Sequence, residues 1–274
     1  MTELKYKFTN DILFKLLFVQ YPDLLKRLVA ALLSIPYESI GQFVITNPDM
    51  PPEVMGEKFC RLDINMTVNG QRVDLEIQVK DEGDYPERSL YYWAREFSTA
   101  LGESEQYIDL PRTIVVNIVA FKMFECAEFH SEFQALEVKR HERLTDKFSL
   151  HFFELPKLPK TVSKDDGLKL WLALFNAKTE EELKQIEALE VPIMKEAIGA
   201  YRTVSATDKF KELERLRSRA RHNEASALGR AKREEREKWQ GVVAEKDIAL
   251  NEKDIALAEQ AALIAELQKK LDKI

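Results

Sequence analysis

The sequence lacks the short motifs that mark several large enzyme classes. It contains no HExxH, no CxxC pair, no GxGxxG and no GxxxxGK[ST]. These motifs bind zinc, dinucleotides or nucleotide phosphates, so zincins, zinc ribbons, dinucleotide-binding folds and P-loop NTPases have no support. Histidine is also scarce, and no nucleophile stands beside any of the four at a catalytic spacing. We interpret them as structural or surface residues: His130, His141, His151 and His222.

Cysteine is scarce too, and long apolar runs are missing. Cys60 and Cys126 lie in apolar, strand-like contexts, which favours buried thiols in a reducing compartment over a disulfide. The longest uncharged run, Leu28 to Tyr37, is far shorter than the roughly 18 residues that indicate a membrane span, and the charged N-terminus has no secretory pattern. We therefore expect a cytoplasmic protein without a membrane partner.

An excess of basic charge is absent as well. The 274 residues include 41 Lys and Arg against 47 Asp and Glu, a formal net charge of −6. Proteins that coat nucleic acid bind by neutralising phosphates with Lys and Arg, so this balance argues against such a role. An enzyme that releases its product needs only a local basic patch. The length is sufficient for one buried core with appended elements.

The segment 58–80 has the pattern of a β-hairpin. Asn69-Gly70 stands between two alternating runs, and this dipeptide is the strongest short-range signal for a two-residue turn. If these residues form the turn, the register places Asp63 opposite Glu76. A slip of one residue would expose the apolar face, so the pattern itself supports this register. The apolar pairs are then Met66 with Val73, Ile64 with Leu75, Leu62 with Ile77, and Cys60 with Val79.

Two carboxylates that face each other across a strand pair repel, because their Cβ atoms lie about 4.5–5.5 Å apart. A divalent cation such as Mg²⁺ would offset the repulsion, since it binds one or two carboxylates together with water and phosphate. The alternative is a solvated strand face on which basic neighbours balance the acids. The same face carries a mixed polar set that leaves this alternative open: Arg61, Arg72, Asp74, Gln78 and Lys80.

Several motifs around the hairpin occur together. Asp63 followed by Glu76-Ile-Gln78 resembles the D…(D/E)xK signature of PD-(D/E)XK nucleases, in the variant with Gln at the Lys position. Four segments within about residues 1 to 160 resemble the recombination-promoting nuclease (Rpn) family, also labelled PD-(D/E)XK nuclease family transposase. They are Phe8-Thr-Asn-Asp-Ile-Leu-Phe-Lys-Leu-Leu-Phe18, Leu75-Glu-Ile-Gln-Val-Lys80, Arg88-Ser-Leu-Tyr-Tyr-Trp-Ala-Arg95 and Phe153-Glu-Leu-Pro-Lys157.

The resemblance implies an α/β fold with a restriction-endonuclease-like core: a helix, three antiparallel strands, a helix and a further strand in a mixed sheet flanked by helices. It also implies a bacterial-type DNA endonuclease that depends on Mg²⁺ or another divalent cation. The implied metal ligands are the carboxylates of Asp63 and Glu76 and the backbone carbonyl of Ile77. Gln78 would occupy the lysine position, where a neutral amide can orient water or a phosphate oxygen but brings no positive charge.

Two further residues are weaker candidates for the site. Lys80, one pleat beyond Gln78, is a possible substitute donor of positive charge. Asp11, in the first turn of the opening helix, could reach the metal through water, although the helix dipole alone favours an acid there.

The elements outside the hairpin are read from their periodicity. Thr9 or Asn10 should cap a first helix, and its apolar stripe continues after Pro22 to Leu32 and should pack on the sheet. A helix opened by Pro86 should present one apolar side, made of Leu90, Ala94, Phe97 and Leu101. We expect Tyr91, Tyr92 and Trp93 in or beside the core, rather than stacked on bases.

The expected strands besides the hairpin differ in burial. Residues 42–46 could form the first strand. Thr113 to Phe121 is a continuous apolar run, typical of a central strand covered on both faces. Phe133 to Val138 and Phe148 to Phe153 are expected as edge strands.

The prolines of Leu155 to Pro159 suggest the end of the nuclease-like domain, at residues 1–160. A helical extension should follow over 161–206, where Thr179 and Glu182 form a capping box. Residues 207–241 form a strongly charged helix. It is either a solvated helix with i,i+4 ion pairs or a surface that contacts phosphates.

The last segment, 242–274, contains a seven-residue repeat, since Glu245-Lys-Asp-Ile-Ala-Leu is followed by Glu252-Lys-Asp-Ile-Ala-Leu. A coiled coil packs through two apolar positions in every seven residues. Asp254 and Gln268 fall at the second of these positions, which weakens the expected apolar seam. We expect a short coiled coil that makes a homodimer or higher oligomer, with a single exposed helix as the alternative. The residues that share one heptad position are Leu250, Leu257, Ile264 and Leu271.

The sequence therefore predicts a metal-dependent DNA endonuclease that could serve recombination, a mobile element or phage defence. A different class stays open: a nuclease-fold module that does not cleave and acts through oligomers in regulation or DNA association. A true transposase is less favoured, because residues 1 to 160 contain no recognisable sequence-specific DNA-binding module.

Overall fold

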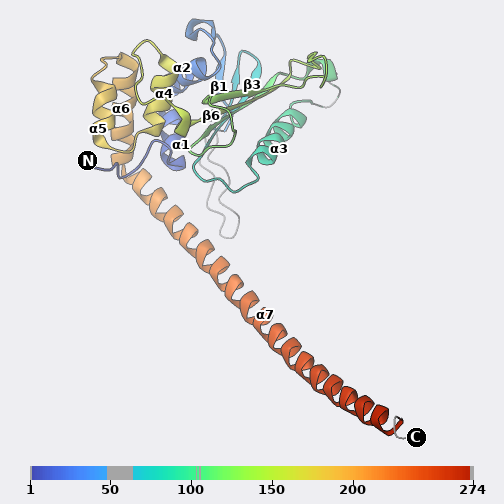
Figure 1. Ribbon diagram of the computed structural model, residues 1–274. Coiled ribbons are helices and arrows are strands. Elements are labelled where there is room, and N and C mark those ends of the chain that lie inside the picture. Colours follow the sequence, from blue (N-terminus) through green and yellow to red (C-terminus); the bar gives the residue numbers. More distant parts are fainter. Residues whose placement is uncertain (1, 48–63, 103, 105, 272–274) are drawn as a thin grey trace. The chain divides into compact units, whose positions relative to one another are not determined.

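The computed structural model describes residues 2–47, 64–102, 104 and 106–271 (Figure 1). The chain divides into two compact units, Met1–Leu213 and Glu214–Ile274. The first unit contains the sheet and all but one of the helices. The second unit is the continuation of a single long helix.

One mixed sheet of six strands organises the first unit. Its spatial order is β1-β2-β3-β4-β6-β5. The pairs β1–β2, β2–β3 and β5–β6 are antiparallel, whereas β3–β4 and β4–β6 are parallel. The strands are β1 (Phe43–Ile45), β2 (Ile64–Val68), β3 (Gln71–Gln78), β4 (Thr113–Val119), β5 (His130–Phe133) and β6 (Phe148–Glu154). Three antiparallel strands, a helix and a further parallel strand follow in chain order, as expected.

The hairpin β2–β3 has the predicted register in its described part. Val68 pairs with Gln71 across Asn69-Gly70, and both turn residues have positive φ, of 48° and 76°. Met66 lies opposite Val73, and Ile64 lies opposite Leu75. The expected partners Leu62 and Cys60 lie outside the described residues.

The hairpin ends earlier than its alternating pattern suggests. Strand β3 stops at Gln78, and the Val79 side chain is 52% exposed rather than buried. The prediction for Val79 was wrong because alternation marks which face a side chain takes, and it does not show how far the opposing layer extends.

The two faces of the sheet are covered by different helices (Figure 1). One face packs against α1 (Asp11–Gln20), α2 (Pro22–Leu32), α4 (Gly167–Asn176) and α6 (Pro192–Ala206), and these elements share the main core. The other face is covered by α3 (Tyr85–Ser98) and carries a smaller cluster: Tyr85, Val115, Val119, Leu150 and Phe152. Polar residues of the hairpin point toward α3, because neighbouring strand residues face opposite sides.

The start of the first helices follows the predicted chemistry. The Asn10 side chain caps α1 by accepting a hydrogen bond from the Leu13 amide at 2.9 Å. Pro22 stands at the start of α2, where its missing N–H has no intrahelical partner to lose. The Thr179 and Glu182 capping box is present and opens α5 (Glu180–Glu187).

Helix α3 buries a different side from the predicted one. Its buried residues are Tyr85, Ser89 and Tyr92, which recur at i, i+4 and i+7, whereas Leu90 is 47% exposed. Leu101 lies beyond the end of the helix. The prediction followed hydrophobicity, but the sheet face beneath α3 carries polar groups. Aromatic and hydroxyl side chains therefore pack there.

Three predictions for the far edge of the sheet and the connection leading to it were wrong. Strand β6 pairs with β4 and β5, so it is internal, and most of its side chains are buried. Strand β5 covers His130–Phe133 instead of residues 133–138. Cys126, in the connection before β5, is exposed instead of buried, because that segment forms no strand. Cys60 lies outside the described residues.

The helices of residues 161–206 share one core with the sheet. Trp171 and Phe175 of α4 stand beside Phe18 of α1, with ring centroids 6.1 and 6.2 Å apart. Tyr201 of α6 stacks on Phe8 at 4.2 Å. The compact unit therefore extends to Leu213, beyond the boundary expected at residue 160.

The last helix, α7, spans Asp208–Leu271. Phe210, near its start, is buried in the main core of the first unit. Across the described residues, no helix is both long and apolar enough to cross a membrane.

Candidate active site

Glu76 lies in the middle of β3 on the face covered by α3, and the residue is 6% exposed. Asp74, two residues earlier on the same face, is 2% exposed. Burying a carboxylate costs free energy unless hydrogen bonds or opposite charge compensate. A strand that retains two buried acids therefore suggests a local chemical use for them.

A hydroxyl from α3 holds the Glu76 carboxylate. Tyr85 Oη lies 3.2 Å from Glu76 Oε2 and 2.9 Å from Asn117 Oδ1. Ser89 Oγ, one helical turn after Tyr85, lies 3.2 Å from the same Asn117 oxygen. Asn117 Nδ2 donates to the His151 carbonyl at 3.1 Å. We call Tyr85, Ser89 and Asn117 the Tyr85 network.

Strand pairing explains how these groups meet. Asn117 on β4 pairs directly with Glu76 on β3, so both side chains take the α3 side of the sheet. Asn117 is fully buried within a strand that is otherwise almost entirely apolar. A role for Asn117 was not predicted from the sequence. The signal was present, because a lone amide in a central apolar strand needs a polar partner.

The electrostatics of the network keep the phenol protonated. Burial, together with the charge of Glu76, raises the pKa of Tyr85 well above its ordinary value. The hydroxyl therefore stays protonated, and so a hydrogen-bond donor, at neutral pH. The Arg88 guanidinium stands 4.8 Å from the centroid of the Tyr85 ring, and its positive charge lowers the pKa of Tyr85 in part.

The residues after Glu76 are placed by the end of the strand. The Gln78 carbonyl accepts a hydrogen bond from the Ala120 amide on the β4 side. The Ile77 carbonyl is therefore directed toward the β2 side of the strand, since carbonyls alternate along it. Gln78 Nε2 donates to the Lys80 carbonyl at 2.9 Å. Lys80 itself is exposed beyond the end of β3.

The predicted site residues Asp63 and Asp11 differ in whether the structure describes them. Asp63 lies outside the described residues, and Ile64 and Leu75 form the first described pair of the hairpin. Asp11 begins α1, where its Oδ1 accepts from the Ile12 amide at 2.9 Å. One turn later Lys15 is 1% exposed, and this buried lysine was not predicted from the sequence.

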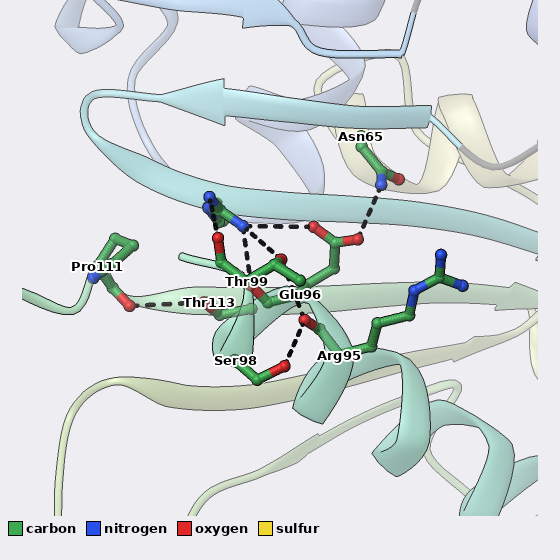
Figure 2. A network of polar contacts seen from close by, with 8 residues as sticks. Asn65, Arg95, Glu96, Ser98, Thr99, Pro111 and Thr113 are labelled. Atoms are coloured by element: carbon green, nitrogen blue, oxygen red, sulfur yellow. Dashed lines mark hydrogen bonds and ion pairs between the residues drawn. The ribbon is translucent and has the colours of Figure 1, made fainter. Parts of the chain in front are cut away.

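A small polar cavity of about 150 Å³ lies under the same face, between the hairpin and the end of α3. Asn65 Nδ2 donates to Glu96 Oε1 at 3.1 Å, and Figure 2 shows this contact beside Thr99. Arg72 donates to the Glu96 carbonyl at 2.9 Å and to Thr99 Oγ1 at 3.1 Å. Asp74 also lines the cavity. The two described acids of this face, Asp74 and Glu76, are therefore enclosed, which argues against a fully solvated strand.

A second polar cluster lies at the far edge of the sheet. His130 Nε2 and His151 Nδ1 are 3.1 Å apart, and Ser149 Oγ lies 2.9 Å from His151 Nε2 and 3.1 Å from Glu132 Oε1. Burial lowers the pKa of His151 to about 4 and also lowers that of His130. Both histidines are therefore neutral at neutral pH.

The described residues fit part of a divalent metal site. Glu76 offers a carboxylate and Ile77 a carbonyl, which are the oxygen donors that Mg²⁺ prefers. The Tyr85 hydroxyl lies within hydrogen-bond distance of this carboxylate, at 3.2 Å from Glu76 Oε2. No group of three His, Cys, Asp or Glu side chains that could hold a metal occurs within the described part of the chain. The expected second carboxylate, Asp63, falls outside it.

One comparison with known proteins gave a match. The family model described as PD-(D/E)XK nuclease family transposase matches residues 8–231. It thus covers the sheet, helices α1 to α6 and the first part of α7, farther than the motifs of residues 1 to 160. Neither the curated proteins nor the solved structures gave a match.

Proposed function

Because the chain belongs to the PD-(D/E)XK nuclease family transposases, we propose that it is a divalent-metal-dependent endonuclease that hydrolyses phosphodiester bonds in DNA. The observation that carries this proposal is the buried carboxylate of Glu76. Glu76 lies on the hairpin whose sequence resembles the family motif, and the Tyr85 hydroxyl of α3 lies 3.2 Å from its Oε2. A buried acid of this kind is costly for folding alone, and a metal site gives it a use.

The proposed metal ligands are the carboxylates of Asp63 and Glu76 and the carbonyl of Ile77. Asp11 is proposed as a weaker participant through water. A bound Mg²⁺, or another divalent cation, supplies a water of lowered pKa and shields the charge on the scissile phosphate. Glu76 contributes to cation binding by placing its carboxylate next to the Ile77 carbonyl.

The role of Gln78 differs from that of the superfamily lysine. Its Nε2 donates to the Lys80 carbonyl, so its Oε1 is the atom that can orient a water by accepting a hydrogen bond from it. The amide carries no charge to place beside a phosphate. Lys80 is proposed to supply that charge, because it is exposed two residues farther along the chain.

We further propose that the protein acts on DNA in the cytoplasm as a homodimer or higher oligomer, in recombination, mobile-element function or defence. The support for assembly is the exposed stripe on α7, where Leu250, Leu257 and Ile264 are 58%, 62% and 56% exposed. A seven-residue repeat of this kind pairs helices into a coiled coil. Two active sites held together would suit cleavage of both strands of a duplex.

Deleting residues 242–274 tests the assembly, because it removes this stripe and leaves β3 intact. Sedimentation should report a smaller species. Single-strand nicking should persist, while paired double-strand cuts become rarer because the effective concentration of the second site falls. An unchanged oligomeric state would show that the segment is a solvated helix.

A second candidate function is a module of the same fold that does not cleave and acts in regulation or DNA association. The observation in its favour is the neutral Gln78 at the lysine position. Incubation of purified protein with supercoiled plasmid, with Mg²⁺ or with EDTA, separates the two. The endonuclease converts the plasmid to nicked or linear forms with Mg²⁺ alone, and Asp63→Ala does not.

The control for that experiment is Glu142→Ala, which removes an exposed carboxylate from the loop after β5 and should cleave like the wild type. Equal cleavage by wild type and Asp63→Ala would refute the proposed site. No cleavage by a folded wild type that still binds DNA would favour the regulatory module.

A further inference from the structure

We propose that the Tyr85 network is a positioning device that sets the orientation of the Glu76 carboxylate for cation binding. The inference rests on the proposed function, because it assigns Glu76 to a metal. It adds three residues that touch neither metal nor substrate in the proposal: Tyr85, Ser89 and Asn117.

The protons of the network can be counted. Asn117 Nδ2 donates to the His151 carbonyl, which turns the Asn117 Oδ1 toward α3 as an acceptor. The Tyr85 hydroxyl has one proton and two acceptors in reach, Glu76 Oε2 at 3.2 Å and Asn117 Oδ1 at 2.9 Å. A hydroxyl donates only one hydrogen bond at a time. Tyr85 therefore serves either Glu76 or Asn117.

The orientation of the Ser89 hydroxyl determines whether Tyr85 donates to Glu76 or to Asn117. Its hydroxyl lies 3.2 Å from Asn117 Oδ1 and 3.0 Å from the Tyr85 carbonyl. When Ser89 donates to Asn117, that oxygen is satisfied and the Tyr85 proton is available to Glu76. When Ser89 donates to the helix carbonyl, the Tyr85 proton goes to Asn117. The two arrangements need only hydroxyl rotations, so the network can follow the charge on Glu76 without moving a heavy atom.

The hydroxyl of Tyr85 is fixed by packing around its ring. Tyr85 is 1% exposed, and the rings of Phe121 and Phe152 stand edge-on at 5.9 and 6.4 Å. The Arg88 guanidinium lies over the ring. A glutamate has three side-chain torsions and would sample several orientations alone. The rigid phenol restricts them, which is how an outer-shell group prepares a ligand.

Structural need alone does not account for the network. A phenylalanine at 85 and a valine at 117 would fill the same layer without burying polar atoms, and apolar replacements of buried polar groups are often neutral or stabilising. Asn117 occupies the β4 position that pairs with Glu76, and Tyr85 and Ser89 reach it from α3. Their location thus follows the carboxylate.

The test measures Mn²⁺ binding by the full-length chain in calorimetry, without DNA. Tyr85→Phe removes one oxygen and keeps the ring. Since outer-shell partners typically contribute 10–100-fold to metal affinity, we expect Mn²⁺ to bind about tenfold more weakly. The matched control is Tyr201→Phe. It removes a hydroxyl that donates to the Tyr6 carbonyl in the main core, and it should leave Mn²⁺ affinity unchanged at a similar loss of thermal stability.

Ser89→Ala keeps the inference testable if Tyr85→Phe does not fold. Removing the Ser89 hydroxyl draws the Tyr85 proton to Asn117, so Mn²⁺ affinity should fall in the same direction, by less than with Tyr85→Phe. Wild-type affinity in both variants would overturn the inference. The proposed function is tested separately by Glu76→Gln. If wild type binds Mn²⁺ and Glu76→Gln does not weaken it, or if wild type binds none, the function and the inference both fall.

Discussion

The two faces of the hairpin β2–β3 differ in what determines them. On one face Ile64, Met66, Val73 and Leu75 are almost completely buried against the helices of the main core. On the other face Asp74 and Glu76 are buried as well, but under α3, where Glu76 lies within hydrogen-bond distance of Tyr85. The first face needs only apolar surface of suitable size, whereas the second needs particular atoms at particular distances.

This difference separates stability from chemistry within a single strand. Leu75 and Glu76 are neighbours, yet one contributes to the free energy of folding and the other imposes a cost on it. Exchanging each for a smaller or neutral residue should therefore move different quantities. The experiments below test that separation, beginning with the largest expected effect.

Glu76→Gln should abolish metal-dependent cleavage of plasmid DNA. A bound metal lowers a barrier by several kcal/mol, so a loss of about 10³-fold or more is expected. The free energy of unfolding, measured in urea without metal, should stay the same or rise, because a buried charge is removed. Full activity of this variant would show that the carboxylate is not a ligand.

Leu75→Ala is the counterpart on the other face. Leu75 is fully buried, and its truncation should lower the free energy of unfolding by about 2–5 kcal/mol. At a temperature at which the variant stays folded, its cleavage rate should remain within a few fold of wild type. A rate as low as that of Glu76→Gln would mean that the two faces are not separable.

The sequence could predict the first face because its information is local. The turn Asn69-Gly70 and strict alternation fix the register from residues within one hairpin, and the described pairs agree with it. The caps of α1 and α5 were predictable for the same reason, since each depends on side chains within one helical turn.

The second face depends on contacts distant in sequence. Tyr85 reaches Asn117 across 32 positions, and nothing in either local pattern announces the pairing. The apolar residues of α3 pointed to the wrong side of that helix, because the layer beneath it is polar. Lys15 was hidden in the same way, inside a helix whose other residues in that stretch are apolar.

Buried polar groups also lie at the far edge of the sheet, outside the layer covered by α3. His151 lies on β6, and it is held by His130, Ser149 and Glu132. Burial lowers the pKa of His151 from 6.5 to about 4, while Glu132 raises it and Arg112 lowers it. Between these values the unfolded chain binds more protons than the folded one, so stability should fall as the pH drops from about 6.5 to 4.

His151→Gln should remove most of that pH dependence. In wild type the free energy of unfolding should decrease by up to roughly 3 kcal/mol between pH 7 and pH 4 through this histidine. Urea unfolding at several pH values checks the slope. His222→Gln, which alters an exposed histidine of α7, is the control and should keep the wild-type slope. An unchanged slope in His151→Gln would place the dependence in other groups.

The smallest expected effect concerns Gln78, at the edge of the polar face. Gln78→Lys restores the superfamily pattern and places a cation near the proposed scissile phosphate. The side chain is partly exposed at the end of β3, so a lysine can extend into solvent without a burial cost. We expect cleavage to be retained or to rise several fold, because a positive charge stabilises the developing charge on phosphate.

Cleavage assays at low and high salt separate an effect at phosphate from general attraction to DNA, since general attraction weakens steeply with salt. Complete loss of activity would show instead that the neutral amide, which donates to the Lys80 carbonyl, holds the end of β3 in the shape that the Ile77 carbonyl requires.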